Sequence, residues 1–271
     1  MNELMRSNSS LMDLSDRTAL ITGGAGHLGR AMAISLAEQG AKIILLDASE
    51  AVLESAKEIL MKDYAVSVEC IKVDLESSEQ IADVPALIAE YGGTLDILVN
   101  NAAFSGTSKL TGWGVPFEQQ SVETWRRALE VNLTAVFAMA KVCKPLLRRS
   151  AGGSIINVAS IYGVLGPDMS LYDGTEMGNP AAYAASKGGL IQLTRWLATV
   201  LSPDVRVNCI SPGGRERGQP LVFQERYIEK TPLRRMAVEE DFKGVALFLA
   251  SDMSRYITGQ NILVDGGWST W

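Results

Sequence analysis

The chain has 271 residues, of which 47% are hydrophobic and 21% charged, and its formal net charge is −6. This composition supports a buried core and excludes a largely disordered chain. Non-specific nucleic-acid binders are usually basic, so the acidic balance argues against a nucleic-acid partner. The three cysteines, Cys70, Cys143 and Cys209, lie far apart and form no CxxC pair. We therefore expect no disulfide framework and no metal site.

The first residues are polar, and we expect residues 1–14 to be an N-terminal tail before one domain over 15–271. The tail lacks the apolar segment of a secretory signal peptide. No stretch of the sequence approaches the roughly 20 apolar residues that a membrane span requires. Together with the unpaired cysteines, this predicts a cytoplasmic protein with no membrane partner.

Short apolar runs alternate with longer segments of helical period. The sequence predicts strands at 18–22, 42–46, 66–73, 95–99, 154–159, 205–210 and 261–264. It predicts helices at 28–39, 51–62, 77–91, 121–149, 181–201, 220–228 and 239–251. Such alternation is typical of βαβ units, and near-continuous apolar strands indicate a sheet covered on both faces. The predicted fold is α/β, a single-domain Rossmann fold with a doubly wound parallel sheet of about seven strands.

A glycine-rich turn follows the first predicted strand and opens the first long helix. It reads Thr-Gly-Gly-Ala-Gly-His-Leu-Gly over residues 22–29. Glycines allow a sharp turn and close approach of a pyrophosphate, and the free N–H groups of a helix N-terminus favour phosphate. The turn therefore predicts binding of a dinucleotide cofactor by Gly23, Gly26, His27, Leu28 and Gly29. His27 is the chain's only histidine, and its place beside the phosphates argues against a catalytic role.

The second predicted strand ends in Asp47. A carboxylate at this position can accept hydrogen bonds from both hydroxyls of an adenosine ribose. It would repel a 2′-phosphate by about 4 kcal/mol at about 4 Å and an effective dielectric constant near 20. No lysine or arginine follows closely to offset this repulsion, so Asp47 predicts NAD(H) rather than NADP(H) as cofactor.

Tyr183 and Lys187 are four residues apart in a predicted helix and therefore share a face. A free tyrosine has a pKa of about 10, which must fall for the phenol to act as an acid or base near neutrality. The Lys187 ammonium and an oxidised nicotinamide can lower that pKa by favouring the phenolate. Ser160, at the end of a predicted strand, can donate a hydrogen bond to a substrate oxygen as charge builds there. These residues predict transfer of hydride between a nicotinamide and a secondary alcohol or ketone.

The glycine turn, the Ser160 position and the YxxxK spacing resemble the short-chain dehydrogenase/reductase family of the classical type. Four further motifs, in the family's order, carry the resemblance from about Leu14 to Trp268: Asp74-Leu75, the run Asn100–Ala103, Asn132 between Val131 and Leu133, and Pro212-Gly213. The resemblance implies the strand order 3-2-1-4-5-6-7. It also implies a Ser160, Tyr183, Lys187 and Asn132 tetrad, in which Asn132 holds a water that links Lys187 to solvent. Cofactor contacts are implied for Asp74, Leu75, Asn101, Ala102, Tyr183, Lys187, Pro212 and Gly213.

The sequence departs from the family pattern in places that bear on the substrate. His27 replaces a glycine of the turn, and Ser160 and Tyr183 are 23 residues apart where about a dozen is usual. The enlargements at 104–120, which carries Lys109, and 163–180 leave the edge of the sheet where substrates bind. A lid is expected at about 213–235. We expect substrate contacts from Trp113, Tyr162, Arg215 and Arg217, the arginines because they can bind phosphate or carboxylate.

Residues 231–268 resemble family members found with bacterial surface-sugar pathways, which suggests a sugar, sugar-phosphate or amino-sugar substrate. A reductase of small keto compounds or 3-oxoacyl thioesters is the alternative. A sugar-nucleotide epimerase and a non-catalytic NAD-binding scaffold are less favoured. The helices at 121–149 and 181–201 resemble the family's subunit interface, so a homo-oligomer is expected, either a tetramer or a dimer. The sequence leaves open the substrate's identity, the direction and the stereochemistry.

Overall fold

Seven parallel strands form the centre of the molecule, in the order β3-β2-β1-β4-β5-β6-β7. The computed structural model describes residues 5–105, 108 and 110–271. The strands are β1 Thr18–Thr22, β2 Lys42–Asp47, β3 Val68–Lys72, β4 Ile97–Asn100, β5 Gly153–Val158, β6 Val205–Pro212 and β7 Asn261–Val264. The predicted α/β fold and strand order are confirmed. The order reverses direction between β1 and β4, which is where ligands bind in doubly wound sheets.

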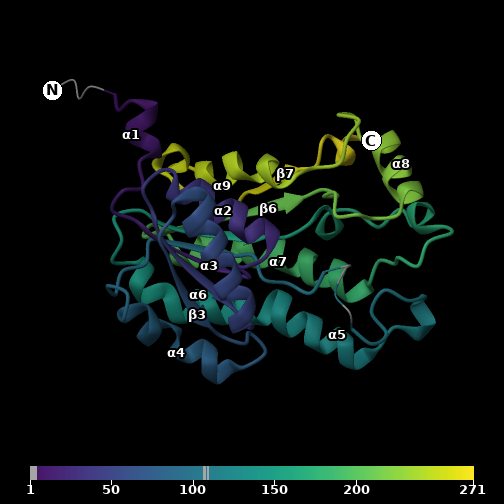
Figure 1. Cartoon of the computed structure of the whole chain (residues 1–271), viewed down its shortest axis with the longest axis horizontal. Helices are drawn as coiled ribbons and strands as arrows, with labels where there is room; N and C mark the ends of the chain where they lie inside the picture. Colours follow the sequence, from purple (N-terminus) through teal and green to yellow (C-terminus); the bar gives the residue numbers. More distant parts are fainter. Residues whose placement is uncertain (1–4, 106–107, 109) are drawn as a thin grey trace.

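Two layers of helices cover the sheet (Figure 1). On one face α2 His27–Ala37, α3 Glu50–Tyr64 and α9 Lys243–Ala250 bury side chains such as Met32, Leu53 and Leu249. On the other face α4 Ser78–Ala89, α6 Ala135–Leu147 and α7 Ala181–Leu201 bury Ile88, Met139 and Leu197. Every residue of β1, β4 and β5 is buried, as the near-continuous apolar strands predicted.

The register of the strands brings their carboxyl ends to one edge of the sheet. Thr22 pairs with Leu46 on one side and Asn100 on the other, and Asn100 pairs with Asn157. The glycine turn and the segments after Asn100 and Val158 therefore leave the sheet side by side.

The helix predicted over 121–149 is interrupted by a wider turn. It consists of α5 Val122–Leu129, a π-helical turn at Glu130–Thr134 and α6. π-turns insert one residue into a helix and often occur at functional sites. Here the turn carries Asn132. The 3.6-residue period of apolar positions on either side does not reveal such an insertion, so the sequence predicted one regular helix.

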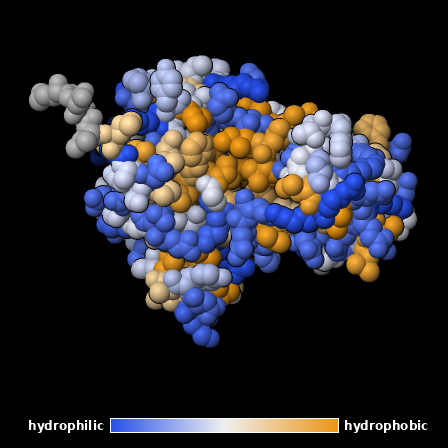
Figure 2. All heavy atoms as spheres, turned by 90° about the horizontal axis from the view of Figure 1, so that it is seen from above, coloured by the Kyte–Doolittle hydropathy of each residue, from blue (hydrophilic) through white to orange (hydrophobic). Residues whose placement is uncertain are grey.

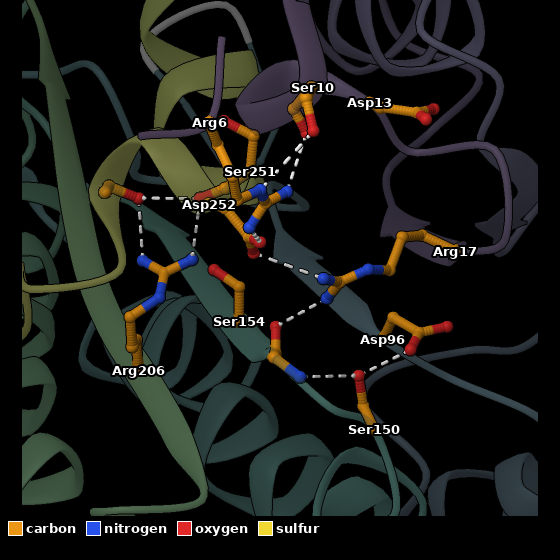
Figure 3. Close-up of polar contacts among 12 residues, drawn as sticks. Arg6, Ser10, Asp13, Arg17, Asp96, Ser150, Ser154, Arg206, Ser251 and Asp252 are labelled. Carbon is orange, nitrogen blue, oxygen red and sulfur yellow. Dashed lines mark hydrogen bonds and ion pairs between the residues drawn. The ribbon is translucent and has the colours of Figure 1, made fainter. Parts of the chain in front are cut away.

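At the amino edge of the sheet, polar groups are densely paired (Figure 3). Arg17 donates to the Gly152 carbonyl at 3.0 Å and to Asp252 at 3.2 Å. Asp96 accepts from the Thr18 amide at 2.8 Å and from Ser150 Oγ at 2.5 Å. The described part of the predicted tail also ends here, in a short helix, α1 Asn8–Met12. Arg6 anchors it by a 2.5 Å ion pair with Asp252.

Arg206 lies beside this network and is largely buried. Its guanidinium donates to Ser254 Oγ and the Leu249 carbonyl, both at 2.8 Å, and to the Ser251 carbonyl at 3.3 Å. Burial lowers the pKa of Arg206 to about 10. We call the polar groups around Arg17, Arg206 and Asp252 the amino-edge clamp.

At the opposite edge, the predicted lid and the enlargement at 163–180 pack together. The lid contains α8 Leu221–Lys230, and the enlargement contains a 3₁₀ turn at Met169–Tyr172. Arg226 donates to the Asp173 carbonyl at 2.6 Å, and Lys230 forms an ion pair with Asp168. Tyr172, Phe223, Tyr227 and Trp268 form an apolar cluster between them, in which the Tyr227 and Trp268 rings stack at 4.3 Å. The enlargement is therefore part of the packed wall of this edge.

Candidate active site

A crevice of about 660 Å³ lies along the carboxyl edge of the sheet. Its size is typical of a small-molecule site. Most of the predicted site residues line it: Gly23, Gly26, His27, Leu28, Asp47, Asp74, Leu75, Asn101, Ala102, Ser160, Tyr162, Tyr183, Lys187, Pro212, Gly213, Arg215 and Arg217. Three do not line it, namely Gly29, Asn132 and Trp113.

The glycines of the turn let its backbone lie close to neighbouring backbone segments. Gly23 has a φ of +59°, and a Cβ on it would lie 2.8 Å from Ala102 Cα. A Cβ on Gly29 would lie 2.4 Å from the Gly23 carbonyl oxygen, so this glycine serves helix packing. Gly26 is the N-cap of α2. The turn therefore brings the N-terminus of α2 to the crevice.

Asn101 holds this turn against the end of β4. Its Nδ2 donates to the carbonyls of Thr22 and Gly23, each at 3.0 Å, and the Thr22 hydroxyl accepts from the amides of Asn101 and Ala102 at 3.0 and 3.1 Å. The side chain thus fixes the shape of this end of the crevice from inside the protein.

Asp47 and Asp74 stand at the ends of β2 and β3 in the same crevice. Burial raises the pKa of Asp47, and hydrogen bonds from backbone amides, including that of Ala48 at 2.9 Å, oppose this shift. Asp74 accepts from the Glu76 amide at 2.9 Å. Glu76 in turn pairs with Arg127 at 2.7 Å. Arg127 lines the crevice and was missed from the sequence, because only the fold brings α5 next to the turn after β3.

His27, a departure from the family pattern, and Arg215, an expected substrate contact, meet at Glu239. His27 Nδ1 lies 3.7 Å from the Glu239 carboxylate, which also forms an ion pair with Arg215. Burial and the positive charge of Arg215 lower the pKa of His27. This contact joins the glycine turn to the lid across the crevice.

Tyr183 and Lys187 lie on the face of α7 that borders the crevice. Lys187 Nζ is 5.8 Å from the centre of the Tyr183 ring and donates to the Val158 carbonyl at 2.6 Å. Its side chain is buried, which lowers its pKa to about 8. These contacts bring the phenol and the amine together at the end of β5, beside Ser160.

The pKa of Tyr183 shifts in the direction opposite to the predicted one. Burial raises it, while a hydrogen bond with Ser160 and the positive charge of Arg217 act in the lowering direction. Among the protein groups, burial outweighs these two contributions and the pKa of Tyr183 is raised. The predicted lowering relies on Lys187 together with an oxidised nicotinamide, and it stays a prediction for the cofactor-bound protein.

Asn132 is completely buried in the π-turn. Its Oδ1 accepts from the Phe104 amide at 2.8 Å, and its Nδ2 donates to the Phe104 carbonyl at 3.0 Å and to Ser186 Oγ at 3.1 Å. Both ends of the side-chain amide are thus used by protein groups. The side chain therefore positions the segment after β4 and the start of α7. The water relay through Asn132 stays a prediction.

Trp113 belongs to the core and not to the substrate site. It is 2% exposed, packs with Ala128 and Ala182, and donates its indole N–H to the Ser105 carbonyl at 2.7 Å. The expected substrate contact is therefore wrong, because the ring stabilises the enlargement at 104–120 from within. Lys109, from the same enlargement, lies outside the described residues.

The enlargement at 163–180 does contribute polar groups to the crevice. The Tyr162 and Tyr172 hydroxyls are 3.0 Å apart, and Asn179 Nδ2 donates to the Tyr172 hydroxyl at 3.2 Å. Burial raises the pKa of Tyr162, so its hydroxyl stays neutral. Tyr172 and Asn179 were not predicted as site residues, since nothing in the sequence places the enlargement over Ser160.

The two arginines predicted to contact the substrate differ. The Arg215 side chain is 9% exposed and its charge is matched by Glu239. Arg217 is exposed at the crevice, and within the described ranges its guanidinium has no carboxylate partner. Arg217 is therefore the better placed of the two to meet an anionic group.

In the part of the chain that the structure describes, no cluster of three or more histidine, cysteine or acidic side chains is placed to hold a metal ion. None of the helices found in those residues combines the length and apolar character needed to cross a membrane.

The chain is similar to known proteins over nearly its whole length. A protein-family model described as enoyl-(acyl carrier protein) reductase matches residues 23–269. The chain is 35% identical over 268 residues to a probable galactose dehydrogenase from Rhizobium meliloti (strain 1021), covering 96% of this chain and 98% of that protein.

Solved structures agree in fold and differ in cofactor. A short-chain dehydrogenase from Leptospira borgpetersenii with bound NAD⁺ is 33% identical, with a TM-score of 0.83 over 99% of this chain and 98% of that one. An NADPH-dependent 3-quinuclidinone reductase from Rhodotorula rubra is 27% identical, with a TM-score of 0.85 over 100% of this chain and 98% of that one. The family match, the identities over nearly the whole chain and the shared fold show that this protein is an oxidoreductase of the short-chain dehydrogenase/reductase family.

Proposed function

We propose that the protein interconverts a secondary alcohol and a ketone by hydride transfer with NAD(H), on a polar, sugar-like substrate. The observation that carries this proposal is the single crevice that joins Ser160, Tyr183 and Lys187 to the glycine turn and Asp47. The first group fits acid–base chemistry at a carbinol oxygen, and the second fits a dinucleotide.

The residues of the crevice suit NAD(H). The turn at Gly23 and the N-terminus of α2 would hold the pyrophosphate, and Asp47 would accept hydrogen bonds from the adenosine ribose. The environment of Asp47 already disfavours one negative charge, since burial raises its pKa. A 2′-phosphate beside it would add a second charge at a cost of about 4 kcal/mol. When bound, the nicotinamide would supply the hydride acceptor or donor.

Tyr183 would exchange the proton of the substrate hydroxyl, and Ser160 would donate a hydrogen bond to the same oxygen. Loss of the Tyr183 proton needs a nearby positive charge, because burial raises the phenol's pKa. An oxidised nicotinamide carries such a charge, and Arg217 adds a second at longer range. Alcohol oxidation would therefore speed up as the pH rises and Tyr183 loses its proton.

The crevice wall suits a polar substrate. Tyr162 and the neighbouring hydroxyl and amide groups can bind substrate hydroxyls, and Arg217 can bind a phosphate or carboxylate. This agrees with a sugar, sugar phosphate or amino sugar and with a role in carbohydrate metabolism. The name of the Rhizobium meliloti relative supports the same substrate class.

A direct comparison of cofactors and substrates tests the proposal. We expect reduction of NAD⁺ by at least one polyol or sugar of a broad panel, with NAD⁺ preferred over NADP⁺ by at least tenfold. Asp47→Ser should reduce that preference, because it removes the repulsion of a 2′-phosphate. Equal use of both cofactors by the unaltered protein would contradict the assignment of Asp47.

A reductase of small keto compounds or 3-oxoacyl thioesters is the second candidate. The 3-oxoacyl-(acyl-carrier-protein) reductase of Thermotoga maritima, to which the chain is 33% identical over 266 residues, favours it. The same panel separates the two, because a thioester reductase would turn over 3-oxoacyl thioesters and no sugar. A non-catalytic scaffold would bind the cofactor and turn over nothing.

Large apolar side chains on α5, α6 and α7 remain exposed, and we include a homo-oligomer, tetramer or dimer, in the proposal. Phe137 is 44% and Trp196 54% exposed. On the side of α9 and β7, Figure 2 shows apolar residues gathered near the middle of the surface. The free edge of β7, with Leu263 39% exposed, lies on this side. Light scattering would measure the oligomeric state in solution. The unpaired cysteines agree with a reducing, cytoplasmic location.

A further inference from the structure

Three polar side chains form a row in the crevice wall next to the reacting groups. Asn179 Nδ2 donates to the Tyr172 hydroxyl, which is 3.0 Å from the Tyr162 hydroxyl. Two of the three come from the enlargement at 163–180, which lengthens the segment between Ser160 and Tyr183. The row is therefore a feature of this chain's own sequence.

The amide oxygen of Asn179 is buried and has no hydrogen-bond partner. Within the described ranges it is the one buried side-chain nitrogen or oxygen atom in this condition. Turning the amide over would leave its nitrogen unpaired instead, so the side chain keeps one unused end in either orientation. Proteins pair nearly all such groups, and an exception in a crevice points to a partner that arrives with a ligand.

The row lies close to the reaction centre. The Tyr162 amide donates to Ser160 Oγ at 3.2 Å, so Tyr162 begins directly beside the catalytic serine. Tyr172 is near enough to Tyr183 to raise its pKa. Asn179 stands just before Pro180, the N-cap of the helix that carries Tyr183. A substrate whose reacting oxygen meets Ser160 and Tyr183 would have its neighbouring carbon next to this row.

We propose that Asn179, held by Tyr172 and Tyr162, selects substrates with a second hydroxyl beside the reacting carbinol. These are vicinal diols and α-hydroxy ketones, the chemistry of polyols and sugars. The second hydroxyl donates to the free amide oxygen and gives it its missing partner. Asn179 is thus a specificity-determining residue that takes no part in hydride or proton transfer. This inference rests on the proposed function, since it uses the same reacting oxygen.

The test compares a vicinal cyclohexanediol with cyclohexanol. For each alcohol it measures kcat/KM with NAD⁺ and, by calorimetry, the affinity for the enzyme–NADH complex. The unaltered protein should favour the diol by about tenfold, the value of one hydrogen bond. In Asn179→Leu and Tyr172→Phe the ratio of diol to cyclohexanol should fall to about one. Met169→Leu, a change at an exposed position of the same enlargement outside the crevice, should keep the original ratio.

A stability measurement separates selection from a structural role. Asn179→Leu removes an unpaired buried oxygen, so its Tm should equal or exceed that of the unaltered protein. A lower Tm together with an unchanged ratio would assign Asn179 to structure and overturn the inference. So would an unaltered protein without diol preference in both turnover and binding.

The two proposals fail in different ways. If both alcohols are oxidised equally well, the dehydrogenase function stands and the selection by Asn179 is wrong. If neither is oxidised but the diol binds more tightly and needs Asn179, the selection stands and the proposed reaction is wrong.

Discussion

The two edges of the sheet treat polar groups in opposite ways. In the amino-edge clamp, Arg17 and Arg206 each bind two or more acceptors, and Asp252 binds two arginines. At the carboxyl edge, Lys187 is 2% exposed, and within the described ranges it has no carboxylate partner. The amide of Asn179 lies there with an unused oxygen.

This difference separates stability from function. A polar group that is fully paired inside the protein stabilises the fold and has nothing left to offer a ligand. A buried polar group without a hydrogen-bond or charge partner lowers the stability of the fold, and it gains a partner only when a ligand binds. The amino-edge clamp should therefore stabilise the fold. The unpaired polar groups of the crevice should destabilise it, because they are kept for binding and catalysis.

The largest expected effect is on catalysis at the carboxyl edge. Tyr183→Phe removes the group that exchanges the substrate proton, which should lower kcat by about 10³-fold. The Tm and the affinity for NADH should change little, because the ring remains. The measurement is steady-state turnover with fluorescence titration of NADH, and near-normal turnover would place the acid–base group elsewhere.

The next effect is on stability at the same edge. In the folded protein the pKa of Lys187 is lowered to about 8 from the usual 10.5. Below pH 8 the fold must bury an ammonium, which costs up to about 3 kcal/mol. Between pH 8 and 10.5 the unfolded chain binds more protons than the folded one, so this cost disappears as the pH rises.

Lys187→Met should therefore be more stable than the unaltered protein at pH 7, by less than that amount because the Val158 carbonyl loses its donor. The gap should close by about pH 10. Urea unfolding of both proteins at the two pH values gives the gap directly. A difference in the free energy of unfolding that is independent of pH would show that burial of the Lys187 charge does not destabilise the fold.

A substitution in the amino-edge clamp should have the opposite effects, which are a loss of stability and an unchanged kcat. Arg206→Met keeps the apolar stem but leaves Ser254 and two carbonyls without their donor, which should cost about 2 kcal/mol of stability. For a chain of this size the Tm should fall by roughly 4–8 °C, with kcat unchanged. A loss of activity in the folded variant would contradict the assignment of stability to the amino edge and of function to the carboxyl edge.

The smallest expected effect concerns the contact that joins the lid to the glycine turn. Glu239→Gln removes a negative charge beside Arg215 and His27 and leaves the Arg215 guanidinium free to attract phosphate. NADH should bind about threefold more tightly at low salt, and the gain should shrink as salt screens it. Glu240→Gln, a change at a neighbouring exposed residue, is the matched control. Weaker binding would indicate that Glu239 orders the lid instead.

The parts of the site that the sequence predicted are local motifs at strand ends. The glycine turn, Asp47 and the Tyr183–Lys187 pair each depend on a few adjacent residues, so spacing alone identifies them. The parts that it missed depend on contacts between distant segments. The pairing of Arg215 with Glu239, the packing of Trp113 and the row ending in Asn179 are all of this kind. The inward turn of Asn132 depends on a π-turn that apolar periodicity does not reveal.

The central claim is that this crevice transfers hydride from a carbinol carbon to a nicotinamide while Tyr183 takes the proton. The most direct measurement uses a substrate alcohol with deuterium on its carbinol carbon and follows the label by NMR. The account predicts deuterium at the reactive carbon of the NADH formed by the unaltered protein, and almost none with Tyr183→Phe. Substrate consumption without label on the nicotinamide, or equal labelling by the variant, would contradict it.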